Sequence, residues 1–231
     1  MAIVSRRIAK PFPGKSDVVL SRVSRFRDLV IKAGAKARAA KFIGGSLNGA
    51  IQLTTIYDNM SEATKSFESY SKDPEMVALM KEREDSPAAT LIGPEIYTGV
   101  YGAPSPDHNV LLLREYDMER KSMPKAIELL SKVEEIVQKE DSKMLALRPI
   151  IADKMDALFV VYYYSSIASM GEIIDRVGMS EEFQKLVNEA SEYGTLKSSN
   201  VLIFSSLCRT SALLGPTPFR YAIGVVSICI L

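Results

Sequence analysis

The side chains best suited to chemistry in this chain are two arginines at equivalent places. Arg7 and Arg114 each lie in a short apolar segment that favours a strand. An arginine that points into a protein interior can hold a carboxylate or an enolate oxygen through charge-assisted hydrogen bonds. An arginine at a sheet edge is instead exposed, or pairs with an acid such as Glu115. We treat both arginines as candidate ligand-binding residues and keep the structural alternative open.

Polar and aromatic side chains on predicted strands form the second candidate group. Side chains alternate between the two faces of a strand, so Gln52 and Thr54 share one face of the strand predicted at 50–57. Tyr163 lies on the corresponding face of a later strand, and Tyr97 on another. Together these residues would form a mixed apolar and hydrogen-bonding pocket for a small organic ligand. The alternative is a filled core whose tyrosine hydroxyls reach water.

Ligands for a metal or a cofactor are scarce. His108 is the only histidine, which excludes a multi-histidine metal site, and Cys208 and Cys229 are the only cysteines. His108 could act as a general base or as a haem ligand, but prolines precede it and we expect a solvent-exposed loop. The sequence also lacks phosphate-binding, dinucleotide-binding and serine-hydrolase motifs. We therefore predict no cofactor and no metal, with haem disfavoured.

Composition and charge describe a globular chain without electrostatic bias. The net charge is +1 over 231 residues, so charge does not indicate a nucleic-acid partner. No apolar leader segment accompanies the N-terminal arginines, so we expect a cytoplasmic protein. Residues 219–231 are mostly apolar but too short to span a bilayer, which needs about 20 residues.

The first hundred residues predict the element order β-α-β-β-α-β. Apolar and β-branched runs bounded by Gly or Pro predict strands at 4–9, 36–43, 50–57 and 95–101. Val19, Val23, Phe26 and Val30 recur at helical spacing after Ser16, which can cap that helix. Ser61 and Asp73 are the caps expected for the second helical part, which restarts at Pro74.

The same order recurs after a shift of 107 positions without a gap. The shift places Val23 on Leu130 and Asp73 on Ser180, so an apolar helix face and an N-cap are both retained. We interpret the chain as a duplicated unit. Residues 1–101 are the first repeat, 102–108 the linker, 109–207 the second repeat, and 208–231 a tail outside the repeat.

The duplicated unit resembles the dimeric α/β-barrel superfamily, which includes stress-responsive barrel proteins, antibiotic-biosynthesis-type monooxygenases and EthD- or NIPSNAP-like proteins. The resemblance rests on GAIQLTTIYDN, SEATKSFESYSKDPEMVAL, DALFVVYYYSS and GMSEEFQKLV, and it covers residues 1–207. It implies two ferredoxin-like sheets packed face to face into a barrel, usually from two chains and here from one. The superfamily also includes two-repeat haem proteins of the chlorite dismutase type, whose axial ligand is a histidine on the second repeat. His108 lies in the linker and departs from that pattern.

We therefore predict an α+β fold in which two tandem ferredoxin-like β-α-β-β-α-β repeats form one pseudo-dimeric barrel. Helices cover one face of each sheet, so the two uncovered faces must meet. The ligand site is expected between the sheets, lined by Gln52, Thr54, Tyr97, Tyr163, Arg7 and Arg114. Any cavity should lie nearer the first sheet, since Gln52 and Thr54 are smaller or more polar than Phe159 and Val161.

The expected function is binding of a small organic ligand, with cofactor-independent monooxygenase- or isomerase-like chemistry. The alternative is a non-catalytic structural or partner-binding barrel. Copies of the chain could associate through sheet edges or through the apolar tail. No membrane span and no nucleic-acid partner are expected.

Overall fold

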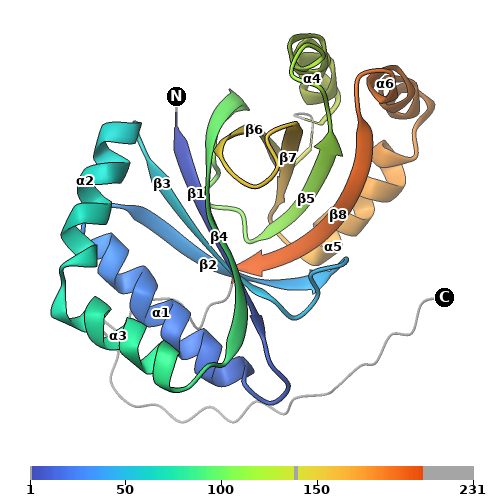
Figure 1. Ribbon diagram of the computed structural model, residues 1–231. Helices are drawn as coiled ribbons and strands as arrows, with labels where there is room; N and C mark the ends of the chain where they lie inside the picture. The colour runs from blue at the N-terminus through green and yellow to red at the C-terminus, as the bar shows by residue number, and fades with distance from the viewer. Residues whose placement is uncertain (1, 138–139, 205–231) are drawn as a thin grey trace.

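The computed structural model describes residues 2–137 and 140–204, and within them eight antiparallel strands close into a barrel with six α-helices outside it (Figure 1). The first half contains β1 (Ile3–Pro11), α1 (Ser16–Lys32), β2 (Lys36–Gly44), β3 (Ile51–Tyr57), α2 (Met60–Ser71), α3 (Pro74–Asp85) and β4 (Ala89–Gly102). The second half contains β5 (Val110–Asp117), α4 (Met123–Val137), β6 (Ser142–Ile151), β7 (Ala157–Tyr164), α5 (Ile167–Ile173), the π-helical turn η1 (Ile174–Gly178), α6 (Glu181–Ser191) and β8 (Thr195–Phe204). The predicted α+β fold is confirmed.

The strand order around the barrel is β1-β3-β2-β8-β5-β7-β6-β4. Each half contributes a four-stranded ferredoxin-like sheet, and the halves join where β2 pairs with β8 and where β4 pairs with β6. The circle closes because β4 also pairs with β1. Each of these eight strands therefore pairs on both sides, so none offers the free sheet edge that we considered for self-association.

Matching elements of the two halves begin 106 or 107 positions apart. The first strands begin at Ile3 and Val110, and α3 and α6 begin at Pro74 and Glu181. The element order of the first half thus recurs in the second, with η1 and α5 together in the place of α2. That the two halves are copies of one unit stays a prediction.

Helix starts follow the capping chemistry of the sequence at two of the predicted caps. The Asp73 side chain accepts a hydrogen bond from a backbone N–H of α3 at 2.9 Å, and Ser180 does the same for α6 at 3.3 Å. The cap expected at Ser61 is wrong, because Asn59 caps α2 instead. Ser16 is the first residue of α1 and does not cap it.

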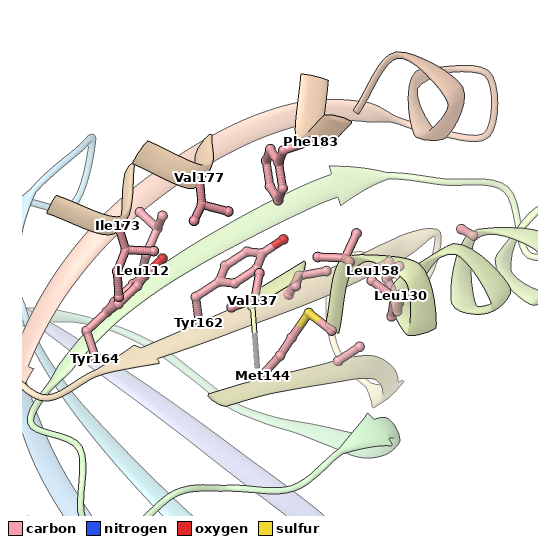
Figure 2. Packing of buried hydrophobic residues seen from close by; sticks show 14 of the residues in the cluster. Leu112, Leu130, Val137, Met144, Leu158, Tyr162, Tyr164, Ile173, Val177 and Phe183 are labelled. Atoms are coloured by element: carbon pink, nitrogen blue, oxygen red, sulfur yellow. The ribbon is translucent and has the colours of Figure 1, made fainter. Parts of the chain in front are cut away.

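Two layers of apolar side chains build the core. One layer fills the barrel, and the other lies between each sheet and its helices. In the second half this outer layer is one continuous cluster that includes Tyr162, Val177 and Phe183 (Figure 2). In the first half it is split into a cluster that includes Val30 and a smaller one that includes Val19.

Neither part of the described chain contains a helix that is long and apolar enough to cross a bilayer. The tail predicted at 208–231 lies outside the described residues, as do the last three residues of the predicted second repeat.

Candidate functional site

Three cavities lie against the barrel wall and differ in size. The interior cavity, between the two sheets, has a volume of about 50 Å³. The first outer cavity, between the first sheet and α1, α2 and α3, has about 390 Å³. The second outer cavity, between the second sheet and the helices of that half, has about 210 Å³. Of these three, the first outer cavity alone falls within the range of about 300–1,000 Å³ that is typical of small-molecule sites.

Gln52, Thr54, Tyr97 and Tyr163 all line the interior cavity. These four side chains therefore lie on the face that strand alternation predicts, while Leu53 lines the first outer cavity. A volume of about 50 Å³ holds a few water molecules. An organic ligand at these four residues stays a prediction, and it would need more space than this cavity offers.

An ion pair that our sequence analysis missed lies at the wall of the interior cavity. Arg6 donates to Glu95 Oε2 from Nη2 at 2.5 Å and from Nε at 3.1 Å, and the Tyr97 hydroxyl donates to the same oxygen at 2.9 Å. Burial raises the pKa of Tyr97 despite the nearby Arg6 guanidinium, so the phenol stays protonated and remains a donor. Arg6 pairs in register with Thr54, which could have revealed its inward direction. Its distance of 89 positions from Glu95 hides the pair from any local pattern.

The prediction that Arg7 and Arg114 lie inside the barrel is wrong. In register, Arg7 pairs with Leu53 and Arg114 pairs with Val160. Directly opposed residues of a ladder share a face, and Leu53 faces the helices, so Arg7 faces them too. The two arginines accordingly line the first and the second outer cavity.

Three elements converge on the Arg7 guanidinium in the first outer cavity. Nη2 donates to the Tyr70 hydroxyl of α2 at 2.9 Å, and Nη1 donates to Ser5 Oγ of β1 at 3.2 Å. The guanidinium carbon lies 5.0 Å from the centroid of the Phe26 ring of α1, a cation–π distance. Burial raises the pKa of Tyr70, although Arg7 opposes the shift, so the phenol is neutral at physiological pH. The site thus presents a guanidinium fork beside a phenol.

The rest of the first outer cavity is mostly apolar. Its wall includes Val19, Val23, Ile51, Leu53, Phe67, Met76, Leu79, Met80, Leu91 and Ile92. Val19 and Ile51 belong to one apolar cluster of this half, whereas Met76 and Leu79 belong to the other. The cavity therefore lies between the two clusters and accounts for the division of the first outer core.

The second outer cavity contains the equivalent arginine but less space. The Arg114 guanidinium carbon lies 5.7 Å from the centroid of the Tyr162 ring, and its Nε has no hydrogen-bond partner among the described residues. Tyr162 occupies the position that Thr55 holds in the first half, and Phe183 that of Met76. Both larger side chains line the second outer cavity, which explains its smaller volume.

His108 is buried, so the expectation of an exposed loop histidine is wrong. Its Nδ1 lies 2.6 Å from Ser105 Oγ, and its Nε2 lies 3.4 Å from Asp141 Oδ1. It lines none of the three cavities. Since it is the only histidine, histidine-ligated haem does not fit either outer cavity. The described residues also contain no group of three or more His, Cys, Asp or Glu arranged to hold a metal ion.

Solved structures with the same fold include proteins of several activities. A candidate monooxygenase from Lactobacillus acidophilus is 9% identical, with 88% of this chain and 96% of that chain covered and a TM-score of 0.58. An anthrone oxidase-like protein is 10% identical, with 92% and 96% covered and a TM-score of 0.61. A haem-binding protein from Thermus thermophilus is 10% identical, with 88% and 90% covered and a TM-score of 0.51. At these identities the likeness is one of fold.

No family model matches the sequence, and the search of curated proteins found no match.

Proposed function

We propose that this chain, which has the dimeric α/β-barrel fold with both sheets in one polypeptide, binds a small and mainly apolar organic molecule in the first outer cavity. The observation that carries the proposal is a cavity of about 390 Å³ beneath the helices, with mostly apolar walls and the hydrogen-bonded pair of Arg7 and Tyr70 among its polar groups. Protein interiors are close-packed, and empty apolar space costs stability. A bound molecule would recover that loss.

The second half supports the assignment by contrast. There Tyr162 and Phe183 occupy space at the equivalent place, and about 210 Å³ remains. The cavity of the first half thus depends on its own side chains: Met76 lines it where the second half has the larger Phe183.

Cofactor-independent oxidation or isomerisation is the reaction class that we propose to test first. Arg7 and Tyr70 are the groups that would polarise an oxygen atom of the bound molecule, and the apolar wall would exclude water from it. A candidate monooxygenase and an anthrone oxidase-like protein among the proteins of similar fold support this order of testing.

We also propose that residues 1–101 and 109–207 are two copies of one unit, joined by residues 102–108. The nearly constant spacing of matching elements, 106 or 107 positions, supports this division.

The binding proposal is tested with a matched pair of cavity-filling variants. Met80 of α3 lines the first outer cavity, and Val187 of α6, 107 positions later, lines the second. Purified wild-type protein, Met80→Trp and Val187→Trp are denatured, and released small molecules are identified by mass spectrometry. The folded proteins are then titrated with decanol by calorimetry.

We expect wild type and Val187→Trp to bind decanol and Met80→Trp to lose at least tenfold in affinity, because the indole occupies the cavity. Co-purification of an apolar molecule with the first two proteins alone would identify the natural ligand. If all three proteins bind decanol equally weakly and release nothing, the first outer cavity is not a ligand site. A non-catalytic structural or partner-binding barrel is then the better description.

A further inference from the structure

We infer that the molecule bound in the first outer cavity is an apolar carboxylate, whose negative charge is held by Arg7. This inference rests on the proposed function, and it names the chemical class of the ligand.

The charge of Arg7 is the first observation. Arg7 is half-buried and lines an apolar cavity, yet no Asp or Glu among the described residues lies within 4.0 Å of its guanidinium. Two nearby arginines differ: Arg6 pairs with Glu95 and Arg22 pairs with Glu82. Removing a cation from water without a counter-charge destabilises the folded protein. A bound anion would offset this destabilisation at Arg7.

The hydrogen-bonding capacity of the site is the second observation. A guanidinium carries five N–H donors, and Ser5 and Tyr70 accept one each from Arg7. The Tyr70 hydroxyl accepts from Arg7 and keeps its own proton to donate. Burial raises the pKa of Tyr70, so the phenol carries this proton at neutral pH. The remaining guanidinium donors and the phenol can therefore serve the two oxygens of one carboxylate.

The rest of the wall restricts the ligand to one anionic group on an apolar body. The other cations of the wall are Arg22, which pairs with Glu82 at 2.9 Å, and Arg83, which is exposed. Arg7 is thus the one half-buried guanidinium of the wall that has no acidic partner among the described residues, whereas the charge of Arg83 is exposed to water. A single half-buried guanidinium matches the one negative charge of a carboxylate better than the two charges of a phosphate monoester. The apolar side chains around it match a hydrocarbon or aromatic body.

Titration with decanoate and with decanol separates this inference from the proposed function. The two probes share a hydrocarbon chain, and decanoate alone carries a charge. Four proteins are compared by calorimetry: wild type, Arg7→Gln, Met80→Trp, and Arg114→Gln as the matched control in the other half. Thermal unfolding of each variant checks that it is folded.

We expect wild type to bind decanoate at least tenfold more tightly than decanol, because the charge-assisted hydrogen bonds form only with the carboxylate. Arg7→Gln should abolish this preference while it still binds decanol, and Arg114→Gln should keep the preference. Met80→Trp should lower the affinity for both probes.

Equal affinity of wild type for the two probes, with both blocked by Met80→Trp, would overturn the carboxylate inference and leave the proposed function standing. A preference for decanoate that survives in Arg7→Gln would also overturn it. If Met80→Trp lowers the affinity for neither probe, the proposed function is wrong, and the inference is wrong with it.

Discussion

The first and second outer cavities have the same position in their halves but different contents. In both, an arginine of the first strand points outward beneath the helices, Arg7 in one and Arg114 in the other. Tyr162 fills part of the second cavity, whereas the first half has Thr55 at that position. The second outer core is one continuous apolar cluster, and the first is divided by about 390 Å³ of cavity. The fold determines where such a cavity lies, and a few side chains determine whether it is open.

Inside the barrel the two sheets differ in polarity. The first sheet contributes Arg6 and Glu95, which form an ion pair. At the positions 107 residues later, the second sheet contributes Leu113 and Leu202, which line the same interior cavity. The two halves thus share an arginine on the outer face of the first strand, but they carry different residues on the inner face of the sheet.

The largest effect is expected from giving the second outer cavity the residue of the first. Tyr162→Thr removes a buried ring from a packed cluster and should lower the free energy of unfolding by about 4 kcal/mol. Denaturant unfolding measures the loss, and decanoate titration shows whether Arg114 then becomes a ligand site. A loss below about 1 kcal/mol would mean that the second outer core collapses around the missing ring.

Breaking the interior ion pair should cost somewhat less. Glu95→Leu removes the partner of Arg6 inside the barrel and should destabilise the protein by about 3 kcal/mol, because a mostly buried guanidinium loses its counter-charge. The double variant Arg6→Leu/Glu95→Leu gives the first sheet the residues of the second and should recover most of the loss. Thermal and urea unfolding of the two variants give the comparison. A double variant no more stable than Glu95→Leu would show that the pair does more than neutralise its own charges.

Equivalent core truncations in the two halves should differ by about 2 kcal/mol in the unfolding free energy that they remove. Ile51 borders the first outer cavity, while Leu158, 107 positions later, lies in the continuous cluster of the second half. Ile51→Ala should therefore cost about 2 kcal/mol and Leu158→Ala about 4 kcal/mol, since Leu158 loses more packing contacts. Equal losses of unfolding free energy in the two variants, measured by urea unfolding, would indicate that the first outer cavity is closed in solution.

The smallest expected effect concerns two matched helix caps. Hydrogen bonding to Lys32, together with a bond from the Glu75 backbone N–H, lowers the pKa of Asp73, whereas Ser180 does not titrate. A carboxyl whose pKa is lower in the folded than in the unfolded state stabilises the folded state at pH values above its unfolded pKa. This contribution is lost as the pH falls through the folded pKa.

Asp73→Ser should therefore make the unfolding free energy less dependent on pH between neutral pH and about pH 2, and Ser180→Ala should leave the dependence unchanged. Chemical unfolding across this range measures both. An unchanged pH profile in Asp73→Ser would show that the half-buried Asp73 side chain does not hold its hydrogen bonds in solution.

The sequence predicts the elements well because they depend on local patterns. Strand alternation correctly placed Gln52 and Thr54 inside the barrel, since one face of β3 is clearly more apolar than the other. The start of α3 followed from Asp73 and Pro74, a cap and a first-turn residue that act over a single helical turn.

The same reasoning failed for Arg7 because the two faces of β1 are alike in character. The inner face includes Val4 and Arg6, and the outer face includes Ser5, Arg7 and apolar residues, so each face carries one arginine among apolar neighbours. The Arg6–Glu95 pair, the burial of His108 and the volume of each cavity depend on contacts between distant segments. Local periodicity contains no information about such contacts.

The presence of both sheets in one polypeptide frees the barrel interior from symmetry. In a barrel built from two identical chains, every inward substitution appears twice, so Arg6 would face a second arginine across the lumen and Glu95 a second glutamate. Here Leu113 and Leu202 stand at those positions instead. Each inward position can therefore mutate alone, and the wall of one sheet can acquire a charge while its counterpart remains hydrocarbon.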